Sequence, residues 1–428
     1  MGGCLPLPIG RAWRDVTEPP GSRKEPPNTR RLSWEELALA TESTNGRLRE
    51  LAGLGIIDPA PGEAPFRSGD ILRVRAVAAL EASGVELAEI AEAISAGDLS
   101  FGYLDYVAQP PPVLSSTHAD ICVELDIPIE VLERIYLAFG LPPPRADEQV
   151  REDDAAIHHG IKLLLDNLDE ADVLHSARVF GEGLRRIAEY QVHLFHTRIE
   201  ERFRRAGIPE PLVLDVALRE VGVRTTPLGE QFASWLYRRH SETFTVEHRV
   251  LHGEADLERA GIRPRPEADP AAIAFLDISG YTRLTEELGD EASAAMPMRL
   301  AVLVQEAAAR HGGRTLKWIG DGVELYFRRP ADAVNCALEL CEQVSAIEIP
   351  GAHVGINAGP LVYENGDFYG RTVNIAARIA AHAGSGQVLV SEAVASNVNC
   401  AGLRFDLLGS VAFKGVAEEI AVYQARWE

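Results

Sequence analysis

Long apolar runs are missing from this 428-residue sequence. No segment approaches the roughly 20 consecutive apolar residues that a membrane-spanning helix needs, and the N-terminus lacks the apolar core of a signal peptide. The five cysteines are scattered and odd in number, and none has zinc-finger spacing. This usage favours a reducing compartment over a disulfide framework. We therefore expect a cytoplasmic protein with no membrane span.

Positive charge is also scarce, because 42 basic residues face 64 acidic ones and the net charge is −22. Such an acidic chain is a poor general binder of nucleic acid or of anionic membranes. Only four of the basic residues are lysines: Lys24, Lys162, Lys317 and Lys414. Since an arginine cannot replace a compact ammonium at every site, each retained lysine is informative.

The length allows two to four domains, each able to bury its own core. Composition and periodicity change along the chain, from a Gly/Pro/Arg-rich start through a long helical part to a C-terminal α/β pattern. We divide it into a disordered tail (1–30), a helix-turn-helix-like module (31–112), a helical regulatory or dimerisation region (113–262), a proline-punctuated linker (263–270) and an α/β domain (271–428).

The first helical module begins with a capping signal, because Ser33 is followed three residues later by Glu36. Short helices follow, and residues 36–73 resemble the winged-helix module of MerR-type proteins. Such modules read DNA with basic residues on a recognition helix. Here the corresponding segment, 44–49, has few charges to meet phosphates. We therefore expect a structural or dimerising module and no DNA binding, with DNA binding as the alternative.

The second helical region, which includes a possible repeat of this plan at 118–165, holds most of the histidines. Nine of the twelve histidines precede residue 253, and His193 and His196 are three apart on one predicted helix face. A zinc pair is one interpretation, and ordinary core or surface histidines are the favoured one. Because histidine titrates near neutrality, a pH-sensing role is a further hypothesis.

The C-terminal pattern combines short apolar strands with helices of moderate length. Its βα-ββ-αββ-αβ order predicts an antiparallel-containing α/β (α+β) sandwich of ferredoxin-like kind. The expected strands are 271–276, 314–319, 323–327, 352–358, 361–363 and 387–390, and the expected helices are 297–311, 331–345 and 372–383.

Two aspartates stand at the ends of these strands. Asp277 ends the first strand, and Asp321 occupies a glycine-flanked turn between two antiparallel strands. If those strands are neighbours in the sheet, the carboxylates converge at one edge and can hold two hard cations. Taken alone, this pattern also fits two surface turn aspartates.

The strings around these residues remove that ambiguity. FLDISGYT at 275–282, LKWIGDG at 316–322 and DFYGRTVNIAARI at 367–379 resemble, in order and spacing, the class III nucleotide cyclase catalytic domain. The resemblance covers about residues 271–426. It implies that Asp277 and Asp321 bind two Mg²⁺ or Mn²⁺ ions per active site, with the backbone carbonyl of Ile278 as a further candidate ligand.

The same resemblance assigns the remaining roles. Lys317 and Asp367 match the residues that read the purine, Asn374 and Arg378 match the pair that orients the ribose and stabilises the pentavalent phosphorus, and Lys414 matches a phosphate-binding lysine. A lysine donor beside an aspartate acceptor complements adenine, which offers an acceptor at N1 and a donor at N6. The expected reaction is therefore the conversion of ATP to 3′,5′-cyclic AMP and pyrophosphate.

In this family the active site lies between two catalytic domains. This one chain holds every residue of both sets, so we expect a homodimer with two symmetric sites. The helical half is then expected to be regulatory. Its stimulus is left open between pH, a lipid, a small molecule and a protein. Two alternatives are a guanylate cyclase and a catalytically silent, nucleotide-sensing DNA-binding regulator. A diguanylate cyclase lacks support, because the Gly-Gly-Asp/Glu-Glu-Phe string is missing.

Overall fold

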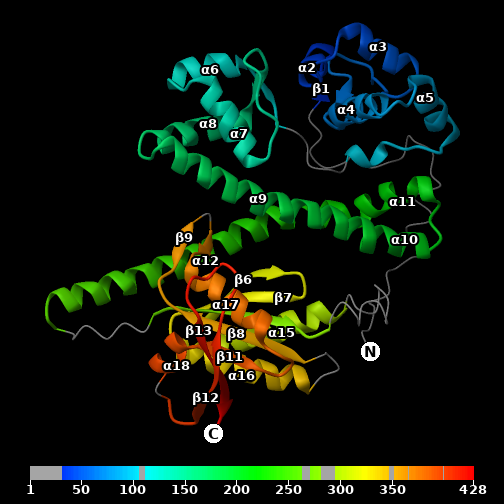
Figure 1. Cartoon of the computed structure of the whole chain (residues 1–428). Helices are drawn as coiled ribbons and strands as arrows, with labels where there is room; N and C mark the ends of the chain where they lie inside the picture. The colour runs from blue at the N-terminus through cyan, green and yellow to red at the C-terminus, as the bar shows by residue number, and fades with distance from the viewer. Residues whose placement is uncertain are drawn as a thin grey trace. The chain divides into compact units, whose positions relative to one another are not determined.

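The computed structural model describes residues 31–105, 111–262, 270–280, 295–346, 351–364, 366–398 and 400–428. The chain divides into two compact units, Met1–His248 and Arg249–Glu428 (Figure 1). The expected tail (1–30) and nearly all of the expected linker (263–270) lie outside the described residues. No helix in the described ranges has both the length and the hydropathy to cross a bilayer.

The first unit opens with helices gathered around a short strand pair. Strand β1 (Arg31–Leu32) pairs antiparallel with β2 (Phe66–Arg67). The backbone N–H of Ser33 donates to Glu36 at 2.8 Å, and the N–H of Glu36 donates to the Ser33 hydroxyl at 3.1 Å, so the predicted capping box is confirmed. The helical elements are α2 (Trp34–Ala40), α3 (Asn45–Gly53), α4 (Gly69–Ala82), α5 (Leu87–Ala96) and the 3₁₀ turn η1 (Gly102–Asp105).

The next segment repeats this order of strand, two helices, strand and helix. Its strands pair antiparallel, and a capping box again joins the first strand to the first helix, between Thr117 and Asp120. Each copy has its own apolar core, one within residues 32–104 and the other within 122–177. The elements are β3 (Val113–Thr117), α6 (His118–Leu125), α7 (Ile129–Phe139), β4 (Gln149–Arg151) and α8 (Glu152–Leu165).

Longer helices complete the helical part. Helix α12 (Val223–Arg259) begins well before the expected start at residue 230 and runs through Pro227. His196 is hydrogen-bonded to Glu200 at 2.9 Å, and no group of three or more potential ligands is found among the described residues, so a zinc site gains no support. The other elements are α9 (Glu170–Leu194), the π-helical η2 (Phe195–Glu200), α10 (Glu201–Arg205), α11 (Glu210–Ala217) and the π-helical η3 (Leu218–Gly222).

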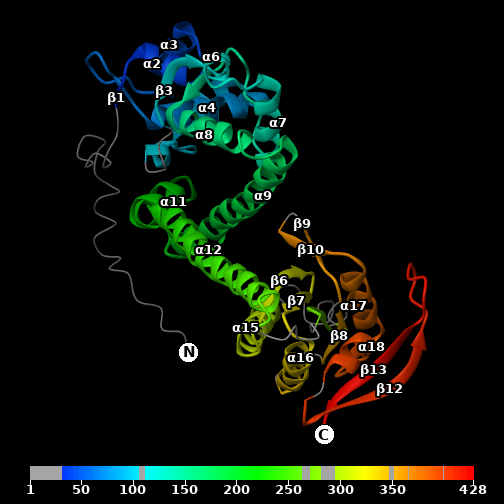
Figure 2. The same ribbon diagram turned by 90° about the vertical axis from the view of Figure 1, so that its left-hand side faces the viewer.

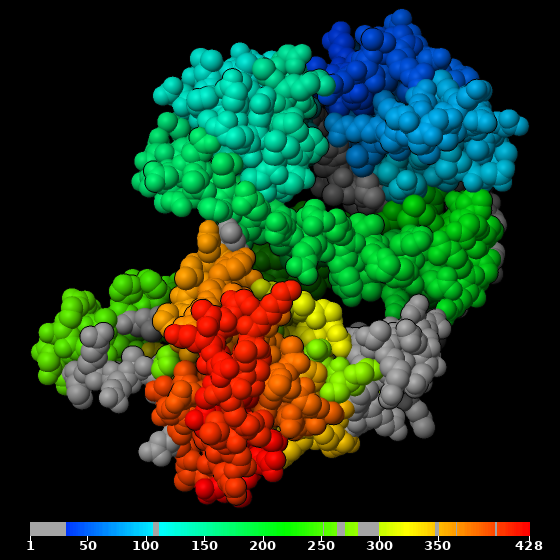
Figure 3. Space-filling model, in the orientation of Figure 1, coloured from blue at the N-terminus to red at the C-terminus, as the bar shows by residue number. Residues whose placement is uncertain are grey.

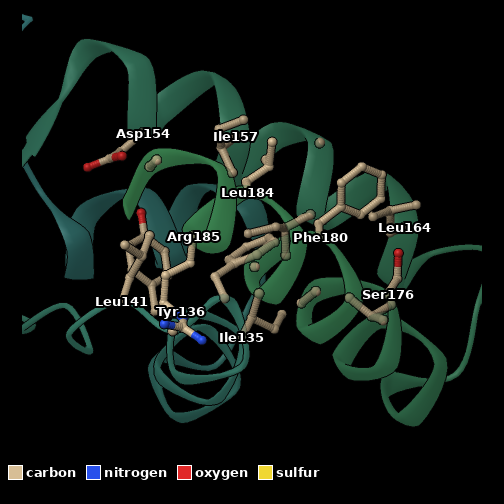
Figure 4. A pocket seen from close by; sticks show the side chains of 18 residues that line it. Ile135, Tyr136, Leu141, Asp154, Ile157, Leu164, Ser176, Phe180, Leu184 and Arg185 are labelled. Carbon is tan, nitrogen blue, oxygen red and sulfur yellow. The ribbon is translucent and has the colours of Figure 1, made fainter. Parts of the chain in front are cut away.

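A cavity of about 740 Å³ lies between α7, α8 and α9 (Figure 4). Its walls are mainly apolar, and Phe180 and Leu184 of α9 line it opposite residues of α7 and α8. The polar groups of Tyr136, Asp154 and Arg185 lie toward one end of it.

The second unit is built on a seven-stranded sheet with the order β12-β13-β11-β8-β5-β7-β6 (Figure 1). Four of its strands, with two helices, follow the chain as β5, α15, β6, β7, α16 and β8. Across the sheet these four strands lie in the order β8, β5, β7, β6, that is, fourth, first, third, second along the chain. This is the ferredoxin-like arrangement, so the predicted fold class is confirmed. The elements are β5 (Ala272–Ile278), α15 (Ala295–Arg310), β6 (Gly313–Ile319), β7 (Gly322–Phe327), α16 (Pro330–Ser345) and β8 (Ala352–Ala358).

The two faces of the sheet are covered differently. Alternate residues of a strand point to opposite faces, so Ala272, Ala274 and Leu276 join α15 and α16 in the larger core. Ile273, between them, packs instead against Val373 of α17 (Arg371–His382). Helix α17 therefore lies on the face opposite α15 and α16.

Two hairpins extend this core. Strands β9 (Val362–Glu364) and β10 (Asp367–Tyr369) form a hairpin of their own that projects near α17 (Figure 2). Strand β11 (Val388–Ser391) runs parallel to β8 and is followed by α18 (Glu392–Asn397). Strands β12 (Leu403–Val411) and β13 (Ile420–Trp427) end the sheet and form much of one face of this unit (Figure 3).

Candidate active site

The two predicted metal-binding aspartates lie together. Asp277 is the penultimate residue of β5, and Asp321 lies in the turn between β6 and β7. Because β5 and β7 are neighbours in the sheet, their ends bring the carboxylates side by side. Partial burial raises the pKa of Asp321, and the charge and hydrogen bonding of Asp277 raise it further.

Glycine makes this approach possible. Gly322 follows Asp321, and a Cβ on it would lie 2.9 Å from the carbonyl oxygen of Leu276 and 3.3 Å from Oδ1 of Asp277. Gly320, on the other side of Asp321, has φ +63°, a conformation that other residues rarely adopt. The Gly-Asp-Gly string is therefore a steric requirement of the turn.

A histidine that the sequence did not single out stands beside this pair. His353 of β8 is the cross-strand partner of Asp277, and its Nε2 lies 3.9 Å from Oδ2 of that aspartate. Its Nδ1 is 3.1 Å from the hydroxyl of Ser279. Ile278, the further candidate ligand, ends β5, and its N–H donates to Oδ1 of Asp277 at 3.0 Å.

The two predicted base-reading residues are also brought together. The Lys317 ammonium on β6 donates to Oδ2 of Asp367 on β10. It also lies 3.2 Å from Oε2 of Glu324, which is fully buried on β7 and was not among the predicted site residues. Partial burial alone would lower the pKa of Lys317, but the hydrogen bonds and charges of Glu324 and Asp367 outweigh it and raise the pKa.

Aromatic contacts hold the hairpin that carries Asp367. The ring of Phe368 stacks on Tyr326 of β7 with centroids 4.9 Å apart and planes 8° apart. The Arg314 guanidinium lies 4.8 Å from the centroid of Tyr326, a distance typical of cation–π contact. The hairpin is thereby fixed to the same two strands that carry Lys317 and Glu324.

Asn374 and Arg378 are one turn apart on the exposed face of α17. The opposite face of this helix is buried against the sheet. Buried polar contacts anchor its first turn, since Asn357 donates to the carbonyl of Thr372 at 3.0 Å and accepts from the hydroxyl of Ser391 at 2.6 Å. The exposed pair therefore projects from a helix that is fixed at its start.

Lys414 lies on the exposed loop between β12 and β13. Phe413, its neighbour, packs with Ile375 and Ile379 of α17. The structure thus places Lys414 on a loop that is attached to the helix carrying Asn374 and Arg378.

The predicted residues therefore form three groups: the aspartate pair, the Lys317–Asp367 pair, and α17 with the Lys414 loop. Between described residues of this one chain, no hydrogen bond or ion pair joins the aspartate pair to either of the other groups.

The family comparison agrees with this geometry. Residues 264–426 match the model of the adenylate and guanylate cyclase catalytic domain. This part of the chain is therefore a class III cyclase catalytic domain, preceded by a helical region. The chain is an enzyme of that class, a lyase.

Several relatives extend the match into the helical half. A pH-sensitive adenylate cyclase of Mycobacterium tuberculosis is 27% identical over 339 residues, 74% of this chain and 82% of the relative. An adenylate cyclase of Streptomyces coelicolor is 26% identical over 64% of this chain and 68% of the relative. Among solved structures, the adenylyl cyclase CyaB from P. aeruginosa is 23% identical, with a TM-score of 0.34 over 37% of this chain and 94% of that one.

Proposed function

We propose that the protein is an adenylate cyclase that converts ATP to 3′,5′-cyclic AMP and pyrophosphate. The observation that carries this proposal is the contact between Lys317 of β6 and Asp367 of β10, which places a donor beside an acceptor. Adenine presents an acceptor at N1 and a donor at N6, and this pair complements both. The names of the relatives support the same substrate.

The reaction needs no covalent enzyme intermediate. The ribose 3′-oxygen forms a bond to the α-phosphorus, the bond from that phosphorus to the bridging oxygen breaks, and pyrophosphate leaves with its electrons while the hydroxyl proton goes to solvent. Arg378 donates to the α-phosphate oxygens, where negative charge develops. Asn374 orients the ribose, and Lys414 binds phosphate.

The aspartate pair fits divalent cations. Burial, and after it the charge of Asp277, raises the pKa of Asp321, and a hard cation bound by these carboxylate oxygens would stabilise their charged forms. Asp277 and Asp321 would hold Mg²⁺ or Mn²⁺, with Ile278 as a further ligand through its carbonyl. When bound, such ions acidify the 3′-hydroxyl and neutralise the triphosphate and the departing pyrophosphate.

The direct test is cyclic nucleotide production by the purified full-length protein. ATP or GTP is supplied with Mn²⁺, and Asp321→Ala serves as the control for contaminating cyclases. Cyclic AMP that disappears in the control supports the proposal. Cyclic GMP in its place supports the guanylate cyclase alternative, and no product from either nucleotide, also from the 271–428 segment alone, supports a silent nucleotide sensor.

We further propose that the active form is a homodimer with the sites at its interface. The separation of the aspartate pair from the other two groups in one chain supports this arrangement, because a complete site then needs a second copy. Asp277→Ala and Arg378→Ala chains should each lose activity by about a hundredfold or more. When mixed, they should regain activity through one intact site, and no regain would contradict the shared site.

The helical half is proposed to regulate the distance or docking of the catalytic domains. Its apolar cavity between α7, α8 and α9 is the place where we expect an effector of low polarity. Activity of the full-length protein should then respond to conditions that leave residues 271–428 alone unaffected. Identical responses of the two would contradict regulation by the helical half.

A further inference from the structure

Glu324 is an acid in the middle of a core strand. It belongs to β7, where its side chain is 0% exposed, and both neighbours along the strand are apolar core residues. In the sheet it lies between Lys317 of β6 and Phe275 of β5. An acid at such a position is rare unless it is paired.

The partner of this acid is one lysine. The nearest positive group among the described residues is the Lys317 ammonium, which forms an ion pair with Glu324 at 3.2 Å from Oε2. Burial raises the pKa of Glu324, and the hydrogen bond and charge of Lys317 act against that rise. The carboxylate therefore depends on Lys317 for its charge compensation.

The ammonium has three N–H donors. The ammonium donates to Oδ2 of Asp367 and forms an ion pair with Glu324, its cross-strand neighbour in the sheet. Lys317 is 40% exposed, so its ammonium also stays accessible to a ligand. Two acids therefore restrain the ammonium while part of it remains open.

We propose that Glu324 is a positioning residue for base recognition, holding Lys317 so that its free N–H meets the acceptor of the purine. The inference rests on the proposed function, since it assigns Lys317 to the base. Without Glu324 the lysine keeps one partner, rotates about its flexible stem and discriminates less between adenine and guanine. Glu324 would act through Lys317 and would not touch the nucleotide.

The test compares Glu324→Leu, Glu324→Gln, Lys317→Met and the Glu324→Leu/Lys317→Met double variant in the full-length protein. The measured quantities are kcat and KM for ATP and for GTP with Mn²⁺. The matched control is Leu325→Val, which disturbs the adjacent core position of the same strand without facing Lys317. Thermal unfolding of each variant separates loss of fold from loss of positioning.

We expect Glu324→Leu to lower the ATP-to-GTP ratio of kcat/KM about tenfold, mainly through a higher KM for ATP. Glu324→Gln keeps an acceptor oxygen and should stay within about threefold of the wild type. The double variant should match Lys317→Met, because the two residues act as one unit. Leu325→Val should leave the ratio unchanged.

Two results would overturn the inference. One is an ATP-to-GTP ratio of kcat/KM in Glu324→Leu that equals that of the wild type. The other is a further fall of this ratio when Glu324→Leu is added to Lys317→Met, as large as the fall that Glu324→Leu causes alone. If the wild type makes no cyclic nucleotide, the proposed function fails separately. Binding of α,β-methylene analogues of ATP and GTP then gives the same comparison without turnover, and an unchanged preference in Glu324→Leu rejects the inference.

Discussion

Each unit of the molecule buries an acid, and the two acids are compensated in different ways. Asp70 of the helical unit is 2% exposed, accepts from the N–H of Arg67 at 2.8 Å and forms an ion pair with Arg73. Glu324 of the catalytic unit is 0% exposed, and the Lys317 ammonium is the positive group that acts on it among the residues described. Burial raises the pKa of both.

The difference lies in what else holds the positive partner. Arg73 is 14% exposed and also lies 3.6 Å from Asp105, which in turn contacts Arg67 at 3.1 Å. This closed network of two acids and two arginines serves the packing of the helices. Lys317 is more exposed and shares its donors with a second acid on a hairpin. The buried Asp70 is thus satisfied within a local network, whereas Glu324 depends on a more exposed residue that is shared with a second acid.

Among variants that test this comparison, Arg73→Ala is expected to change the free energy of unfolding most. It leaves Asp70 buried without its main positive partner and should lower the free energy of unfolding of the helical unit by about 3–5 kcal/mol. Lys317→Met should cost the catalytic unit less, because Lys317 is 40% exposed and solvent screens its ion pair more than that of Arg73, which is 14% exposed. Urea unfolding of both variants measures this, and equal costs would contradict the distinction.

A smaller effect is expected from acid acting on a buried histidine pair in the helical unit. His158 is 1% exposed, its Nε2 lies 3.0 Å from the Tyr136 hydroxyl, and its ring centroid is 5.2 Å from that of His118. Burial, followed by the charges of His118 and His159, lowers the pKa of His158 to about 4. Because the folded-state pKa lies below the unfolded one, stability is full above pH ~6.5 and is lost by about 3 kcal/mol as the pH falls toward 4.

The matched variants for this prediction are His158→Gln and His159→Gln. The first should flatten the acid loss of stability relative to the wild type, and the second, at an exposed position on the same helix, should not. An unchanged acid profile in His158→Gln would refute the assignment. Since His158 stays neutral between pH ~5.5 and ~7.5, a pH response in that range would need other groups.

The smallest effect concerns the two capping boxes. Ser33→Ala and Thr117→Ala each remove the side-chain acceptor of a helix start, and each should cost about 1 kcal/mol. Because the two caps belong to separate cores, the double variant should show the sum of the two losses. A clearly larger combined loss in chemical unfolding would mean that the two copies are coupled.

Much of the catalytic fold could be predicted from periodicity and turn residues. The expected strand 314–319 begins one residue after the observed β6, and the expected 352–358 coincides with β8. The expected strand 361–363 overlaps β9, but its partner β10 was missed, although Asn365-Gly366 is a strong signal for a two-residue hairpin loop. Its pairing of Glu364 with Asp367 leaves only these two residues between the strands.

The candidate site residues come from motifs, and two residues that contact them, Glu324 and His353, lie outside those motifs. Glu324 sits in an otherwise apolar strand, which is a visible anomaly, but its direction toward Lys317 follows only from the β6–β7 register. His353 lies 76 residues beyond Asp277 in the chain, and sheet pairing alone brings them together. Helix α12 includes Pro227, although proline usually breaks or bends a helix.

The doubled strand-helix-helix-strand-helix plan of the helical unit has a consequence for how such a chain can change over generations. Each copy closes its own apolar core within a contiguous stretch of sequence. Recombination that exchanges or removes one copy therefore leaves the buried core residues of the other in place. A lineage built this way can acquire a new helical surface by replacing one segment of a gene, while the α/β domain is inherited unaltered.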